Sequence, residues 1–111
     1  MEMKLNDTPF YQLKSGEKTV ELRLADEKRS RIRVGDTITF ARRAAVEETL
    51  RARVVALHRA EGFAALFATE IFAKCGWGSL SPDEAVTQMR QYYSEAEEEK
   101  YGALGIEIEL L

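Results

Sequence analysis

Segments in which apolar and polar residues alternate one by one place the strongest constraint on how this chain folds. This period of two occurs in residues 19–24, 37–40, 48–59 and 104–110, and it predicts β-strands with one buried face. In the 48–59 segment the inward positions change parity near Val54, which predicts a β-bulge or a strong bend. Helical segments interrupt these strands without a regular strand–helix–strand repeat. The pattern therefore favours an α+β fold with a small, strongly curved sheet or barrel flanked by short helices.

The expected helices are marked by the residues at their ends. Thr8 as N-cap and Pro9 in the first turn begin a short helix, and Gly16 supplies the left-handed residue that ends it. Apolar residues at helical spacing predict a second helix from Gly62 to Ile71. Two later helices begin at capping boxes, formed by Ser81 with Glu84 and by Ser94 with Glu97.

Length and composition narrow the class of protein. A chain of 111 residues has enough material for one hydrophobic core, and it has no apolar run of the roughly 20 residues that a membrane helix needs. One cysteine, Cys75, and one histidine, His58, exclude an internal disulfide and a metal site built from several thiolates or imidazoles. The first residues, 1–7, lack the apolar stretch of a signal peptide. We expect a single monomeric domain over residues 1–111, cytoplasmic, with no cofactor and no membrane partner.

Positive charge is concentrated in the first half of the chain. Residues 14–59 contain 12 Lys or Arg and 7 Asp or Glu, whereas residues 60–111 contain 3 and 10. Arginine binds phosphate through two parallel N–H groups and stacks on bases, so the basic half points to nucleic acid. The arginines expected to hold a phosphate backbone are Arg29, Arg31, Arg33, Arg42, Arg51 and Arg53. The alternative is a solvated surface of salt bridges that binds no ligand.

One short segment carries a family resemblance. Residues 16–23 read Gly-Glu-Lys-Thr-Val-Glu-Leu-Arg, which matches the G-x-K-x-x-E-x-R signature of the ASCH domain family, small relatives of the PUA fold. A Val-Gly-Asp turn at 34–36 and the passage into the last strand at 101–106 are also similar to that family. The resemblance implies a small β-barrel with flanking helices, a cleft beside the signature strand, and RNA as the partner.

The residues themselves support a ligand cleft at the signature. On the predicted strand, Glu21 and Arg23 lie on the face opposite the apolar positions, and Lys18 sits at the turn where the strand begins. A lysine, a carboxylate and an arginine within reach of one another can bind a polar, anionic ligand. The alternative is an ion-pair network that only orders the turn, worth about 1 kcal/mol or less. Trp77, in a glycine-rich loop, either stacks on a base of the ligand or covers one end of the barrel.

A metal-independent hydrolase is the alternative function. Some small bacterial ASCH proteins remove the acetyl group from N4-acetylcytidine, and others are reported to cleave RNA. In the deacetylating members the signature lysine is joined by a threonine where this chain has Glu21, and by a downstream acid, for which Glu70 and Glu84 are candidates here. The missing threonine weakens the deacetylase interpretation. In an enzyme, Lys18 and Glu21 would be the catalytic residues.

Two further interpretations concern the remaining reactive or charged groups. Cys75 is expected to be incidental, because nothing in the sequence brings His58 to it as a base. The acidic residues 95–99 look like a solvated helix start that complements the helix dipole. An interaction module that uses this acidic helix around Glu97 to bind another protein is the third functional class.

Overall fold

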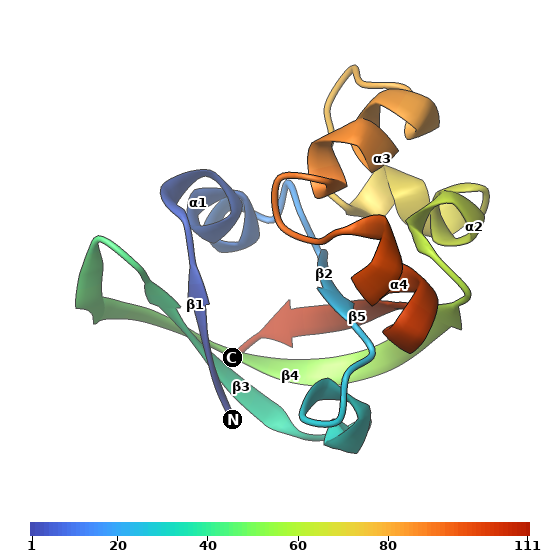
Figure 1. The fold of residues 1–111 in the computed structure, drawn as a ribbon. Coiled ribbons are helices and arrows are strands. Elements are labelled where there is room, and N and C mark those ends of the chain that lie inside the picture. Colours follow the sequence, from blue (N-terminus) through green and yellow to red (C-terminus); the bar gives the residue numbers. More distant parts are fainter.

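The computed structural model describes residues 1–111 and shows a five-stranded mixed sheet that curls into a half-barrel (Figure 1). The strands are β1 (Glu2–Leu5), β2 (Val20–Leu24), β3 (Thr37–Arg42), β4 (Ala45–Ala60) and β5 (Ala103–Leu110). The sheet order is β1-β3-β4-β5-β2, with β1 parallel to β3 and all other neighbours antiparallel. Around the sheet lie α1 (Asp7–Ser15), η1 (Arg29–Arg31), α2 (Phe63–Phe67), η2 (Glu70–Lys74), α3 (Pro82–Met89) and α4 (Glu95–Tyr101), where η marks a 3-10 helix. The predicted α+β class with a strongly curved sheet is confirmed.

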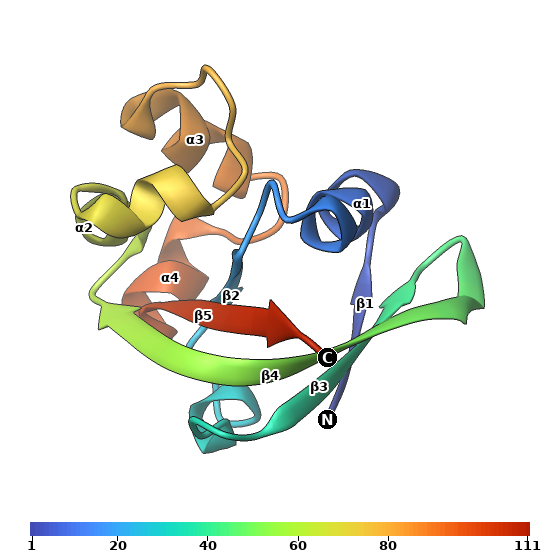
Figure 2. The same ribbon diagram turned by 180° about the vertical axis from the view of Figure 1, so that it is seen from behind.

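The curl of the sheet originates in β4, its longest strand. The first part of β4 pairs with β3 as far as Arg53, and the second part pairs with β5 from Ala52 onward. The register of the β4–β5 ladder shifts between Val54 and Ala56, so the bulge predicted near Val54 is confirmed. An extra residue in one strand bends that strand and increases its twist. The bend brings β1 and β2, the two strands with only one neighbour each, toward the same side of the molecule (Figure 2).

Two apolar clusters lie on opposite faces of this sheet. The inner cluster fills the curl beneath α1 and includes Phe10, Leu13, Ile38, Phe40, Leu104 and Ile106. The outer cluster lies under α2, η2 and α3 and includes Val20, Leu22, Phe63, Phe67 and Met89. In Figures 1 and 2, α1 lies on one side of β2 and helices α2 and α3 lie on the other. A fully buried side chain of this size stabilises the fold by roughly 1.5–3 kcal/mol, so both clusters hold the sheet in its curled form.

The start of the chain differs from the prediction. Residues 2–5 form β1, an edge strand too short to be recognised by its periodicity. The chain turns directly from β1 into α1, so Asn6 occupies the N-cap position and the assignment of Thr8 as the cap was wrong. Asn6 has the extended backbone of a cap, but its side-chain oxygen accepts the Arg43 Nε–H at 3.2 Å instead of a helix N–H.

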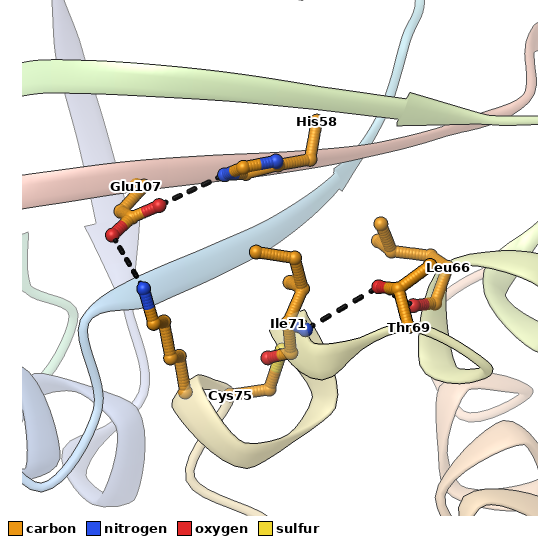
Figure 3. Close-up of polar contacts among 7 residues, drawn as sticks. His58, Leu66, Thr69, Ile71, Cys75 and Glu107 are labelled. Atoms are coloured by element: carbon orange, nitrogen blue, oxygen red, sulfur yellow. Dashed lines mark hydrogen bonds and ion pairs between the residues drawn. The ribbon is translucent and has the colours of Figure 1, made fainter.

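The later helices follow their predicted start signals. Both capping boxes are formed, with serine and glutamate each bonded to the other's backbone N–H. The expected helix from Gly62 to Ile71 is instead split into α2 and η2. The break lies at Thr69, whose hydroxyl accepts the Ile71 N–H at 3.3 Å and so begins η2 (Figure 3). None of the helices has the length and apolar character needed to span a bilayer.

The acidic helix α4 is not wholly solvated, because Glu98 is buried. Its Oε2 accepts the Phe63 N–H at 2.7 Å, and its Oε1 lies 2.6 Å from Nη1 of Arg90. The first N–H groups of a helix have no partner within that helix, so Glu98 supplies the acceptor that α2 needs. Gly62 permits this contact, because a Cβ atom at that position would overlap the Glu98 carboxylate. The expectation that residues 95–99 form a solvated face was therefore wrong at Glu98.

This arrangement generates a stability prediction. We expect Glu98→Ala to lower the free energy of unfolding by about 2–4 kcal/mol, since it leaves the buried Phe63 N–H without an acceptor and removes the nearer of the two carboxylates beside the half-buried Arg90 guanidinium. Urea denaturation followed by circular dichroism measures the change. Glu99→Ala, an exposed neighbour on the same helix, is the matched control and should stay within about 0.5 kcal/mol of wild type. Equal losses in the two variants would show that Glu98 does not tie α4 to α2.

Candidate functional site

The predicted signature spans the end of α1 and the beginning of β2. In the ladder between β2 and β5, Glu21 lies opposite Ile106 and Arg23 lies opposite Leu104. Residues opposite one another in a ladder share a face, so both charged side chains point to the inner side of the sheet. Their alternation with the apolar residues of β2 is as predicted, but the expectation of only one buried face was wrong. The apolar residues of β2 face the outer cluster instead. Both faces of this edge strand are therefore covered.

Lys18, Glu21 and Arg23 form one contiguous group, which we call the charged trio. Lys18 Nζ lies 2.8 Å from Glu21 Oε1. Arg23 approaches the other carboxylate oxygen, with Nε and Nη2 each 3.1 Å from Glu21 Oε2. Lys18 is only 7% exposed and Glu21 only 4%. Sequence reasoning brought these residues together, but it did not anticipate that the carboxylate would be withdrawn from water.

The two cations decide the charge state of the buried carboxylate. Burial by itself raises the pKa of Glu21, but Lys18 and Arg23 together outweigh it through charge and hydrogen bonds, so the pKa of Glu21 lies below its usual range. Glu21 is therefore ionised at neutral pH, and the trio carries one net positive charge. Each cation is oriented by a carboxylate oxygen of its own.

Arg23 also connects the two open edges of the half-barrel. Its Nη2 donates a hydrogen bond of 3.2 Å to the main-chain carbonyl of Lys4 in β1. No ladder joins β1 to β2. A side chain therefore spans the gap that strand pairing would close in a complete barrel, and this leaves room for a cleft beside β2.

A cleft of about 640 Å³ opens at this point, within the usual size range of small-ligand sites. All members of the charged trio line it. Aromatic side chains contribute to the same lining: Trp77, Tyr92 and Tyr93. Tyr93 stacks on Phe63 with the ring centres 5.9 Å apart, whereas the Tyr92 side chain is 56% exposed at the rim. The cleft thus combines a charged floor with aromatic walls.

The loop that carries Trp77 is held against α1. Gln12 donates a hydrogen bond of 2.9 Å from its side-chain nitrogen to the Gly76 carbonyl. Gly76 has a φ of +78°, and a Cβ there would press on Gln12 and Lys18, so this position needs glycine. The Trp77 ring packs edge-on against Phe67 at 6.0 Å, and its buried Nε1–H has no acceptor. Trp77 therefore covers part of the outer cluster and also lines the cleft, and its stacking on a base stays a prediction.

The structure separates the six arginines that were predicted to hold phosphates. Ion pairs join Arg29 to Asp26, Arg42 to Asp7 and Glu48, and Arg53 to Glu109. The other three, Arg31, Arg33 and Arg51, are exposed and form no ion pair. None of the six lines the 640 Å³ cleft. Their role in phosphate binding stays a prediction.

Other polar residues that the sequence did not single out line the cleft. They include Lys4 of β1, Gln12 of α1 and Arg43 of the turn between β3 and β4. No local pattern marks them, because they reach the cleft only after β1 has paired with β3 and α1 has packed over the curl. Lys4 alternates with buried neighbours in β1, and this is the one weak signal that a strand assignment at residues 2–5 would have provided.

Cys75 and His58 do not form a catalytic pair. Cys75 is buried, its thiol lies 3.3 Å from the Ile71 carbonyl, and burial raises the pKa of the thiol to about 11, so it is protonated at neutral pH. His58 Nε2 lies instead 2.8 Å from Glu107 Oε1, a contact visible in Figure 3. Lys74 holds the other oxygen of Glu107 at 3.0 Å. Hydrogen bonds from His58 and then Lys74 lower the pKa of Glu107 and keep it ionised.

The two candidate downstream acids lie outside the cleft. Glu84 is engaged in the capping box with Ser81, whose backbone N–H and hydroxyl both lower the pKa of Glu84. Glu70 is exposed in the first turn of η2. Neither residue lines the cleft that holds Lys18. No three His, Cys, Asp or Glu side chains are grouped so as to hold a metal ion.

The buried carboxylate of the trio generates a pH prediction. Because the pKa of Glu21 is lower in the folded chain than in the unfolded one, its ionised form stabilises the fold fully above the ordinary carboxyl pKa of about 4.3, and this stabilisation is lost as the pH falls through the lowered value. We expect Glu21→Gln to lower the free energy of unfolding by about 3 kcal/mol at pH 7. The difference from wild type should shrink as the pH falls below about 4.3. Urea unfolding at several pH values measures both, and a constant difference from pH 7 to pH 3 would contradict the assignment.

The comparisons with solved structures identify proteins of the same fold. A crystal structure of a hypothetical protein is 34% identical, with a TM-score of 0.87 over 99% of this chain and 97% of that chain. A solution NMR structure of a protein from Pyrococcus furiosus is 30% identical, with a TM-score of 0.73 over 100% of this chain and 98% of that chain. An ASCH protein from Zymomonas mobilis, 18% identical, gives a TM-score of 0.64 over 97% of this chain and 65% of that chain, and it shows a shared fold alone.

The comparison with family models agrees with these structures. No curated protein matches the chain. The ASCH domain model matches residues 3–111, which include the signature strand, the half-barrel and all of its helices. The chain therefore belongs to the ASCH domain family.

Proposed function

We propose that the cleft beside β2 binds single-stranded RNA. One unpaired base of the RNA would lie in the cleft, in contact with the charged trio and Trp77. The observation that supports this most directly is the burial of the trio at a cleft. Withdrawing ions from water costs several kcal/mol per ion, and apolar residues of similar size are often at least as stabilising. Recognition of a ligand therefore explains Lys18, Glu21 and Arg23 better than stability does.

The free donors of the trio define what the ligand must offer. Both carboxylate oxygens of Glu21 already accept from Lys18 and Arg23, so we assign Glu21 the role of positioning these cations. The Lys18 ammonium has three N–H donors, of which the contact with Glu21 uses one. Trp77 adds a buried N–H without an acceptor. The matching ligand groups are acceptors, namely the carbonyl oxygens of bases and the oxygens of phosphates.

The aromatic lining favours an unpaired base. Stacking on an aromatic side chain is worth about 1–3 kcal/mol per base and requires a base that is free of its own helix. The exposed Tyr92 and the half-buried Trp77 of the cleft lining offer such surfaces. Membership of the ASCH family, whose fold resembles that of RNA-binding domains, agrees with this choice of ligand.

The second candidate is a hydrolase that acts on RNA or on a modified nucleoside such as N4-acetylcytidine. It is considered because Lys18 and Glu21, 2.8 Å apart, both line the same cleft. The Lys18 side chain, 2.8 Å from the ionised Glu21 carboxylate, would stabilise a developing negative charge. The Cys75 thiol, with a pKa of about 11, is not a nucleophile at neutral pH. Binding stands first because neither member of the pair is free to act as a base.

The cleft assignment predicts a loss of RNA affinity in Lys18→Gln. A hydrogen bond from a charged donor is worth about 1.5–3 kcal/mol, so we expect binding to weaken roughly ten- to hundredfold. Trp77 is the only tryptophan, and its fluorescence measures binding at the cleft directly. Lys14→Gln, an exposed lysine of α1 outside the cleft lining, is the matched control. Equal affinities in the two variants, with an amide NMR spectrum that shows both are folded, would rule out Lys18 as a ligand contact.

A second variant tests the aromatic wall without disturbing buried residues. Tyr92→Ala removes an exposed ring, so the fold should be unaffected. The free energy of RNA binding should become less favourable by about 1–3 kcal/mol. Tyr11→Ala removes another exposed ring, from α1, that does not line the cleft, and it should leave affinity unchanged. Isothermal calorimetry with a six-nucleotide RNA measures both variants. If Tyr11→Ala weakens binding as much as Tyr92→Ala, the bases do not stack in this cleft.

A further inference from the structure

A second hollow of about 450 Å³ lies beside the cleft, on the outer face of β1 and β3. Its lining contains five cations and a single acid, Glu2. The cations come from four parts of the chain: Lys4, Arg23, Lys28, Arg29 and Arg43. We call this hollow the basic groove.

The basic groove is continuous with the cleft. Three residues, Lys4, Arg23 and Arg43, belong to the linings of both. Arg23 reaches from β2 to the Lys4 carbonyl, so it lies where the two hollows meet. The boundary that the two hollows share therefore carries three positive charges.

The charge of the basic groove is mostly uncompensated by the protein itself. Lys4, Lys28 and Arg43 form no ion pair, and the Arg43 guanidinium donates only to the neutral side-chain oxygen of Asn6. Arg29 pairs with Asp26, yet its buried Nε–H has no acceptor. Uncompensated donors gathered in a concave surface attract anions with several oxygens.

We propose that the basic groove holds the phosphates adjacent to the base in the cleft, so that the ligand is an oligoribonucleotide and not a free nucleoside. This inference rests on the proposed function of the cleft, and it assigns phosphate contacts to Lys4, Lys28 and Arg43, which the sequence had not suggested. Among the arginines predicted from the sequence, only Arg29 lines this groove.

The test uses one charge reversal in the groove and one outside it. Lys28 is exposed, lines the basic groove and does not line the cleft. Lys14 is also exposed, carries the same charge and lines neither hollow. Lys28→Glu and Lys14→Glu change the net charge equally, so a general electrostatic effect acts on both. Each variant is titrated with the four ribonucleosides and with a six-nucleotide single-stranded RNA of mixed sequence, at several salt concentrations.

We expect Lys28→Glu to weaken binding of the six-nucleotide RNA roughly tenfold and to lower the slope of log affinity against log salt by about 0.7, the value for one phosphate contact of a single strand. Nucleoside binding should be unchanged in this variant, and Lys14→Glu should stay within about twofold for both ligands. Equal losses in the two variants, or a wild-type chain that binds the RNA no more tightly than a nucleoside, would overturn the groove assignment.

Failure of the groove and failure of the cleft give different results. If the RNA still responds to Lys18→Gln but not to Lys28→Glu, the cleft binds the base and the groove does not bind phosphate. If Trp77 fluorescence and amide NMR detect neither nucleoside nor RNA at millimolar concentration, the proposed function is rejected, and the groove proposal is rejected with it.

Discussion

The bend in β4 is the constraint on which the rest of the structure depends. This strand pairs with β3 over its first part and with β5 over its second, and the register shift between Val54 and Ala56 turns one half relative to the other. A flat sheet of the same order would hold β1 and β2 at opposite edges, four ladders apart. The bend instead brings both edges to one side of the molecule, encloses the inner cluster, and creates the opening at which the cleft lies.

Charged side chains occupy the gap between those edges, where a complete barrel would have a strand pair. Arg23 bonds to Glu21 within its own strand and to the Lys4 carbonyl across the gap. Lys18 completes the trio at the start of β2. An edge held by side chains stays accessible to a ligand, whereas a ladder would fill the same space with backbone. The charged side chains that bridge the gap in the half-barrel thus also line its cleft.

The fold places the basic residues of the chain in different surroundings. Arg42 and Arg53 are neutralised by neighbouring carboxylates. The two hollows share three lining residues that are scattered along the sequence, namely Lys4, Arg23 and Arg43. A count of arginines therefore predicts nucleic acid as the class of ligand but does not locate a surface for it. The family, in turn, establishes the fold more firmly than the function, because function depends on the particular groups at the site.

Local patterns determined a large part of this protein. The period of two predicted the strands other than β1 and placed Glu21 and Arg23 opposite the apolar residues of β2. The change of parity predicted the bulge near Val54, and the capping boxes predicted where α3 and α4 begin. These features follow from the geometry of a few consecutive residues, so the sequence contains them directly.

Tertiary structure alone decided the rest. It buried Glu21 between two cations and placed the Glu98 carboxylate where it accepts the first N–H of α2. It also brought Lys4 to the cleft through the parallel pairing of β1 with β3. Burial and ion pairing depend on which distant segments meet and in what register. No spacing along the chain reports that information, and for this reason the residues at the edges of the site became visible only in the folded molecule.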